Sequence, residues 1–198
     1  MTTNFMKILN KEYWEERYKT NETGWDVGSI TTPLKEYIDQ IENKDLKILI
    51  PGAGNSYEFD YLISNGFKNV FVIDIAKPPL DNLKKRNPEF QNHFIHDDFF
   101  NLNEKFDLVI EQTFFCALSP ELRQKYVHKM SEIVKTKGKL VGLLFNFPLT
   151  TEGPPFGGCK EEYLALFENQ FNIKTLKKAY NSIKPRADKE LFIIFEKK

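Results

Sequence analysis

The chain has 198 residues, a length typical of one domain, and 41% of them are hydrophobic, which is enough for a substantial core. Lysine plus arginine and aspartate plus glutamate both number 28, so the charge balance favours neither a nucleic acid nor an anionic membrane surface as a partner. No stretch approaches the ~20 apolar residues of a spanning helix, and Cys116 and Cys159 are too few for a disulfide framework. We therefore expect a soluble, cytoplasmic protein, and the lack of a coiled-coil repeat or an apolar surface stripe predicts a monomer.

Aromatic side chains mark the segment that precedes the first strand. Trp14 and Tyr18 stand four positions apart, so they share one face of a short helix. Two glycines bracket Trp25, and a Thr-Pro pair soon after it opens a second helix. Within a single domain, we expect residues 1–44 to form a helical lid and residues 45–198 to form the core. Plain packing of these aromatic residues into the core is the alternative.

Residues 46–75 follow the pattern of a β-α-β unit: an apolar run, a loop with two glycines, a helical stretch and a second apolar run. Gly52 and Gly54 let the backbone approach a ligand, because glycine has no Cβ and tolerates positive φ. Asp74 ends the second run about 20 residues further on, where a carboxylate accepts hydrogen bonds from ribose hydroxyls. The unit predicts a site for an adenosine-containing ligand, with a tight turn and an ordinary strand-end aspartate as the alternative.

The rest of the chain alternates between helical and strand-like runs. Helices are expected from Pro78, from Pro120 through Val134 with Gly138 as the stop, and over residues 160–169. Strands are expected at 93–95, 106–110, 139–147, 172–179 and 191–196. The last two are joined by a polar segment with little helix signal, which favours an antiparallel hairpin. The pattern predicts an α/β fold with a doubly wound, seven-stranded sheet and a C-terminal hairpin, as in class I (Rossmann-like) methyltransferases.

The glycine loop favours one adenosine cofactor over another. A dinucleotide-binding loop usually carries a third glycine, so that the following helix packs close behind the pyrophosphate, and that glycine is missing here. Glu58 and Asp60 enter the first helical turn, where acids repel a pyrophosphate but tolerate a cationic ligand. S-adenosylmethionine carries a sulfonium and an ammonium group and no phosphate. The loop therefore favours S-adenosylmethionine over a nicotinamide dinucleotide.

Several short motifs also follow one another in a fixed order: WxxxY at 14–18, GWD at 24–26, IPGAG at 50–54, DDFF at 97–100, FDLVIEQTFFCAL at 106–118 and GPPFGG at 153–158. Together they resemble the thiopurine S-methyltransferase family, specifically the branch that includes plant halide and thiol methyltransferases. The resemblance implies methyl transfer from S-adenosylmethionine, with S-adenosylhomocysteine as the product. It also implies a small soft acceptor such as a thiol, a thiopurine-like compound or a halide, rather than a nucleic acid.

The resemblance assigns cofactor contacts to eight positions. They are aromatic residues that enclose the cofactor, a loop glycine beside its methionine part, a ribose acid, an adenine-contacting pair and one further contact: Trp14, Tyr18, Trp25, Gly52, Asp74, Asp98, Phe99 and Gln112. Gln112 departs from the family, because the plant branch has tyrosine there and the bacterial branch has arginine.

The acceptor side is expected to combine a loop cation with apolar walls. Family members have basic residues in the loop that corresponds to Arg186, which attracts an anionic nucleophile or is simply a solvated cation. Candidates for the wall are Phe115 and Phe156, together with Phe114 and Phe147.

The reaction expected from these features is an in-line displacement that needs no catalytic residue. A thiolate or a halide attacks without an enzymic base, so rate comes from positioning and from the exclusion of water. His93 and His96 look metal-like, but neighbouring strand positions point to opposite faces, so we predict no metal site. A nicotinamide-dependent oxidoreductase and a non-catalytic S-adenosylmethionine-binding module are the alternatives.

Overall fold

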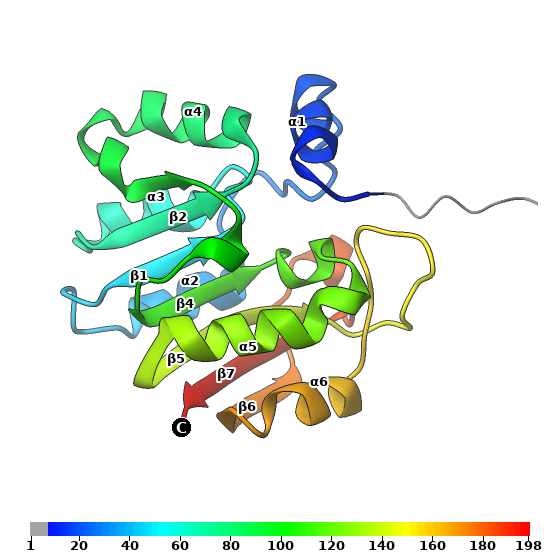
Figure 1. The fold of residues 1–198 in the computed structure, drawn as a ribbon. Helices are drawn as coiled ribbons and strands as arrows, with labels where there is room; N and C mark the ends of the chain where they lie inside the picture. Colours follow the sequence, from blue (N-terminus) through cyan, green and yellow to red (C-terminus); the bar gives the residue numbers. More distant parts are fainter. Residues whose placement is uncertain (1–7) are drawn as a thin grey trace, which may run out of the picture.

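The computed structural model describes residues 8–198, which build a seven-stranded sheet with helices on both faces (Figure 1). The strands lie in the order β3-β2-β1-β4-β5-β7-β6. In chain order they are β1 (Ile48–Pro51), β2 (Val70–Asp74), β3 (Phe94–His96), β4 (Phe106–Gln112), β5 (Val134–Phe145), β6 (Phe171–Lys178) and β7 (Glu190–Lys197). β1 to β5 pair in parallel, and β7 is antiparallel to both β5 and β6. The predicted fold class, including the C-terminal hairpin, is confirmed.

The helices form two layers. α2 (Thr32–Asp39), α3 (Tyr57–Ser64) and α4 (Lys77–Arg86) cover one face of the sheet, whereas α5 (Arg123–Ile133) and α6 (Lys160–Phe167) cover the other. α1 (Lys11–Lys19) lies beyond the carboxyl ends of the parallel strands (Figure 1). Short 3₁₀ turns complete the chain: η1 (Pro88–His93), η2 (Phe99–Asn101), η3 (Phe115–Ala117), η4 (Pro120–Leu122) and η5 (Lys184–Arg186).

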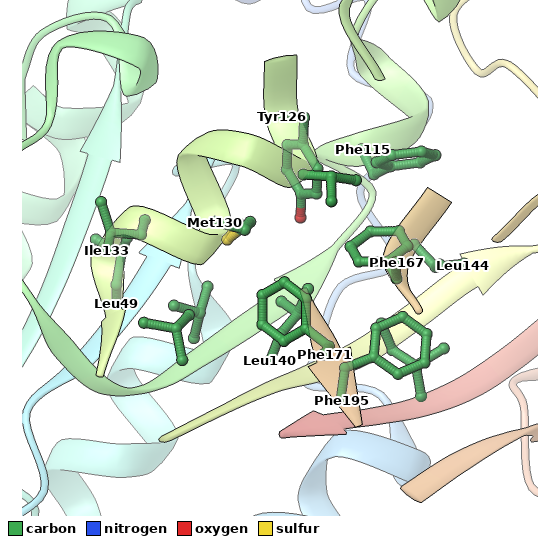
Figure 2. Close-up of a cluster of buried hydrophobic side chains, with 14 of the residues drawn as sticks. Leu49, Phe115, Tyr126, Met130, Ile133, Leu140, Leu144, Phe167, Phe171 and Phe195 are labelled. Carbon is green, nitrogen blue, oxygen red and sulfur yellow. The ribbon is translucent and has the colours of Figure 1, made fainter. Parts of the chain in front are cut away.

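Both faces of the central strands are buried, which explains why these strands are continuous apolar runs in the sequence. Leu49 of β1 faces the α5 and α6 layer, and its neighbours Ile48 and Ile50 face the other layer. Figure 2 shows the core under α5 and α6, where the rings of Phe167, Phe171 and Phe195 meet. Burying each ring of this kind contributes roughly 1.5–3 kcal/mol relative to exposure.

The segment between α5 and β5 differs from the sequence expectation. α5 ends at Ile133, and Val134 already pairs with Phe106 as the first residue of β5. The register then shifts before Lys139, and Lys137 within the shift has a φ of +65°. Gly138 is required by this bulge, because a Cβ there would lie 2.8 Å from the carbonyl oxygen of Lys135. The prediction that Gly138 stops a helix was therefore wrong.

Within residues 8–198 no helix is both long and apolar enough to cross a lipid bilayer.

Candidate functional site

A cavity of about 640 Å³ opens at the carboxyl ends of the parallel strands, and residues of α1 form part of its lining. Its lining comes from the loop between β1 and α3, the ends of β2 and β4, the turns that follow β3 and β4, and the N-terminal segment. Open α/β sheets bind their ligands at this edge. The fold therefore provides a site at this edge that is bounded on one side by the N-terminal segment.

The glycine loop approaches the cavity with its backbone. Gly52 and Gly54 have φ values of +77° and +51°, and both line the cavity. A Cβ at Gly52 would lie 2.9 Å from Cδ2 of Phe114, so only glycine leaves this side of the loop open. Ser56 adopts a φ of +46° at the start of α3, and its hydroxyl donates to the carbonyl of Ala53 at 2.6 Å.

Asp74 ends β2 next to this loop and lines the cavity. Its two carboxylate oxygens accept the backbone N–H groups of Ala53 and Ala76, each at 2.7 Å. Burial raises the pKa of Asp74 to about 6, although these backbone N–H groups act in the opposite direction. The carboxylate is thus held in one orientation at the place expected for a ribose acid.

Asp98 and Phe99 lie side by side on the cavity wall. Asp98 precedes η2, and its Oδ1 accepts the backbone N–H of Phe100 at 2.9 Å, which fixes the side chain. The ring of Phe99 is buried and stacks on Tyr126, with centroids 5.6 Å apart and an interplanar angle of 27°. An acceptor and an aromatic ring therefore stand together.

Three aromatic residues of the N-terminal segment form a cluster over the site. The ring of Trp25 meets the rings of Trp14 and Tyr18 edge-on, with centroid distances of 5.7 and 5.6 Å. All three residues line the cavity. Burial, followed by the charge of Asp74, raises the pKa of the Tyr18 hydroxyl well above its usual value, so Tyr18 stays a neutral phenol. The cluster presents aromatic surface to a ligand beside Gly54.

Asp26 ties this segment to the glycine loop. Its Oδ1 accepts the backbone N–H of Gly28 at 2.8 Å. Its Oδ2 accepts hydrogen bonds from the Asn55 amide and, at 3.3 Å, from the Tyr57 hydroxyl. Asn55 and Tyr57 belong to the loop and to the first turn of α3, so the aromatic cluster and the loop are held against each other.

Gln112 and Arg186 also line the cavity, and each is held by a partner. Oε1 of Gln112 accepts the Thr31 hydroxyl at 2.8 Å, which connects the end of β4 to the start of α2. Arg186 is 7% exposed, and its guanidinium donates to the carbonyl of Trp25 at 2.8 Å and pairs with Glu190 at 3.5 Å. Both charged groups of this pair are buried, so Arg186 is not a freely solvated loop cation.

Phe115 and Phe156, expected on the acceptor wall, do not line the cavity, and neither does Phe147. Phe115 turns into the core, where its ring meets Tyr126 at 5.0 Å (Figure 2). The ring of Phe156 packs against Gly153 of its own loop, where an added Cβ would lie 2.7 Å from the ring. Phe114, one residue before Phe115, does face the cavity.

One residue that shapes the site was not identified from the sequence. Glu111 is fully buried near the end of β4, where Oε1 accepts the backbone N–H groups of Phe114 and Phe115 at 2.8 and 2.9 Å. Its Oε2 accepts the Tyr126 hydroxyl at 2.7 Å, and burial raises its pKa to about 7. The signal was an acid inside an otherwise apolar strand run, which requires buried partners. Glu111 fixes the turn that sends Phe114 to the cavity and Phe115 to the core.

His93 and His96 are engaged separately rather than around a common centre. His93 Nδ1 contacts the carbonyl of Val70 at 2.9 Å, and His96 Nε2 contacts that of Ile75 at 3.1 Å. Across the described part of the chain, no group of three or more histidine, cysteine or acidic side chains could hold a metal ion.

The charges in the cavity fit a cationic, phosphate-free ligand. Glu58 lies in the first turn of α3 and lines the cavity beside the glycine loop, and burial raises its pKa to about 7. Asp74 is a second carboxyl of this lining and is half-buried. A pyrophosphate next to these two acids would be repelled, whereas an ammonium or a sulfonium would favour their ionised form.

Comparison with known proteins settles the family. The family model described as thiopurine S-methyltransferase matches residues 9–197. The chain belongs to this family. It is similar to a probable thiol methyltransferase 2 of Arabidopsis thaliana, with 30% identity over 156 residues that cover 76% of this chain and 69% of the relative. A thiocyanate methyltransferase 1 of Brassica oleracea is 26% identical over 181 residues, which cover 83% of this chain and 80% of the relative.

Solved structures agree with the fold. A Burkholderia thailandensis 1,6-didemethyltoxoflavin-N1-methyltransferase superimposes with a TM-score of 0.77 at 15% identity, covering 94% of this chain and 86% of that protein. As a member of the thiopurine S-methyltransferase family, the chain is an S-adenosylmethionine-dependent methyltransferase. Membership of this family excludes the alternative that the chain is a nicotinamide-dependent oxidoreductase.

Proposed function

We propose that this methyltransferase acts on a small, soft, anionic acceptor: a thiolate, thiocyanate or a halide. One observation supports this acceptor class most directly. The cavity lining includes Leu118, Leu122, Pro154 and Pro155 together with the cationic side chain of Lys125, whose Nζ lies 4.3 Å from the ring centroid of Phe100. We name this set the acceptor end. An apolar wall with one ammonium group favours an anion that is easily stripped of water over a strongly hydrated one.

The rest of the cavity suits the cofactor. We infer that Asp74 accepts hydrogen bonds from the ribose, that Asp98 and Phe99 bind the adenine, and that Gly52 leaves room for the methionine part. The aromatic cluster of Trp14, Tyr18 and Trp25 would enclose the sulfonium; support comes from its position over the loop and from the attraction between cations and aromatic faces. Gln112 would contribute to the cofactor site by holding the start of α2 through its hydrogen bond to Thr31.

Of the predicted lid, residues 1–44, the first seven residues lie outside the described part of the chain; residues 8–44 are proposed to act as a lid, and Asp26 and Arg186 support this role. Asp26 binds the loop side chains, and Arg186 binds the carbonyl of Trp25. The guanidinium of Arg186 is largely committed to Trp25 and Glu190, so we assign it first to holding the lid. Its charge adds to that of Lys125 in attracting an anionic acceptor.

The proposed mechanism requires no general base. When bound, S-adenosylmethionine supplies a methyl group on a sulfonium, which an anionic nucleophile attacks in line to leave S-adenosylhomocysteine. The protein would contribute a near-attack alignment between the acceptor end and the aromatic cluster, and it would exclude water. The Cys116 thiol lines the cavity, but burial holds its pKa far above neutral, so it stays protonated and does not compete as a nucleophile.

The test is the release of S-adenosylhomocysteine with thiocyanate, iodide, hydrosulfide, a small aromatic thiol and a thiopurine. We expect turnover with the anionic acceptors, and with each thiol a rate that rises with pH as the thiolate forms. A Lys125→Met variant should raise the KM for anions about tenfold without changing the affinity for S-adenosylhomocysteine. Lys105→Met, an exposed position before β4, is the control. Saturable cofactor binding without turnover of any acceptor would favour the non-catalytic binding module.

A further inference from the structure

Arg123 is a buried cation outside the cavity. It is the first residue of α5 and is 3% exposed. Its Nη2 donates to the carbonyl of Gly157 at 2.6 Å, its Nη1 pairs with Glu162 of α6, and its guanidinium lies 4.9 Å from the ring centroid of Phe115. Burying a guanidinium is costly unless it is paired and hydrogen-bonded, and here Glu162 and the Gly157 carbonyl are the partners that stabilise it.

The Gly157 carbonyl that binds Arg123 belongs to the base of a loop, and the prolines of this loop are part of the acceptor end. Residues 148–158 leave β5 and return towards α6, and the backbone of Gly158 donates to Phe147 at 2.8 Å where the two ends of the loop meet. Phe156 donates its backbone N–H to Cys116 at 2.8 Å. Between these ends, Pro154 and Pro155 line the cavity.

The loop offers Arg123 only a backbone group to bind. A Cβ at Gly157 would lie 2.3 Å from the carbonyl oxygen of Phe147, so no side chain fits at this point of the loop. The Gly157 carbonyl is the group through which Arg123 holds this part of the loop. Arg123 directs two nitrogens of one planar guanidinium, Nη1 and Nη2, at acceptors on α6 and on the loop, and a lysine has only one nitrogen from which to reach both.

We propose that Arg123 is a positioning residue that sets the size limit for the methyl acceptor. By holding the Gly157 carbonyl, it keeps Pro154 and Pro155 in place as one wall of the acceptor end. Arg123 does not itself line the cavity, so it acts only through the loop. The inference rests on the proposed function in one respect, namely that the acceptor occupies this end of the cavity.

The first measurement does not depend on turnover. In hydrogen exchange followed by mass spectrometry, Arg123→Met should speed exchange in the peptide that contains the Phe156 and Gly158 amides, while β4 stays protected as in the wild type. Glu162→Gln is the matched control, because it leaves the bond from Arg123 to Gly157 in place. Unchanged exchange at Phe156 and Gly158 in Arg123→Met would overturn the proposal.

The second measurement is the selectivity for acceptor size. With hydrosulfide, ethanethiol, thiophenol and naphthalenethiol as a series, Arg123→Met should raise the KM of the smallest acceptors about tenfold and favour the bulky ones. The kcat for the small acceptors and the affinity for S-adenosylhomocysteine should change less than about twofold. The KM of Arg123→Lys for the smallest acceptors should lie between those of Arg123→Met and the wild type. Glu162→Gln should keep the wild-type order of preference among the four acceptors.

A general loss of folding would give a different result from a displaced wall. An equal fall of kcat/KM for all four acceptors would overturn the proposal, and so would a parallel loss of affinity for S-adenosylhomocysteine. If Arg123→Met does not fold, Pro155→Gly tests the wall with Arg123 intact, and an unchanged size order would then contradict the proposal. A wild-type protein that methylates none of the series would instead refute the proposed function, while hydrogen exchange would still test the contact with the loop.

Discussion

Asp74 combines two tasks at a single carboxylate. It holds the glycine loop through the backbone N–H groups of Ala53 and Ala76, and it lines the cavity. We expect Asp74→Asn to weaken binding of S-adenosylhomocysteine about 10- to 100-fold, because a hydrogen bond to a charged group contributes roughly 1.5–3 kcal/mol. Calorimetric titration checks this, with Asp45→Asn, an exposed acid before β1, as the control. Equal affinity in the two variants would remove the ribose role from Asp74.

Glu111 should give the stability of the protein a distinct pH dependence. Burial raises its folded pKa to about 7, above the ordinary 4.5 that applies in the unfolded chain. Stability from the protonated form is present below the unfolded pKa and is lost as the pH rises towards 7. Glu111→Gln cannot ionise, so its free energy of unfolding minus that of the wild type should increase between about pH 5 and pH 7 and level off above.

Urea unfolding at a series of pH values measures this difference. Glu104→Gln, at an exposed acid before β4, should show no such trend over the same range. A difference for Glu111→Gln that stays flat from pH 5 to pH 8 would mean that Glu111 is already ionised throughout.

Single residues were predictable from the sequence where a strand end fixes their direction, and not where a turn does. Asp74 and Asp98 follow parallel strands, so their arrival at one edge of the sheet follows from the topology alone. Phe114 and Phe115 sit in a turn where Thr113 has a φ of +61°, and the Glu111 hydrogen bonds decide which ring enters the cavity. Nothing in local sequence periodicity distinguishes neighbouring residues of such a turn.

At the scale of elements, the N-terminal segment is held to the core by a few polar bonds. We expect Asp26→Ala to release it, because Asn55 and Tyr57 lose their shared acceptor. Hydrogen exchange in the peptide over residues 11–28 should become faster, and the affinity for S-adenosylhomocysteine should fall about tenfold. Glu16→Ala, which removes an exposed acid of α1, is the control. Unchanged exchange in Asp26→Ala would show that the Asp26 hydrogen bonds do not hold the segment.

The types of most elements followed from hydrophobic runs and from proline or glycine at their ends, but two features of β5 and β7 did not. Gly138, after α5, lies in a bulge rather than at the end of a helix. β5 begins earlier than expected, at Val134, which pairs with Phe106. The sequence also did not predict which strand of the C-terminal hairpin pairs with the rest of the sheet. A hairpin can join a sheet through either of its strands, and here β7, not β6, pairs with β5.

For the whole molecule, the cavity couples ligand binding to global stability. A ligand that binds only the folded state at 100 times its Kd adds about 2.7 kcal/mol to the free energy of unfolding. For a chain of this size each kcal/mol shifts Tm by roughly 2–4 °C, so S-adenosylhomocysteine should raise Tm by about 5–10 °C. NADH at the same concentration should produce no shift, because Glu58 and Asp74 disfavour its pyrophosphate. A shift with NADH alone would contradict the cofactor assignment.

The position of β7 bears on how the sheet is completed during folding. Among the strands of the described residues β7 comes last in sequence, yet it lies inside the sheet, hydrogen-bonded to β5 on one side and β6 on the other. Without residues 190–197 in place, β6 has no strand to pair with and one side of β5 is open, as are the apolar partners of Phe195. A folding intermediate in which β7 has not yet docked therefore exposes unpaired strand edges, which favour aggregation.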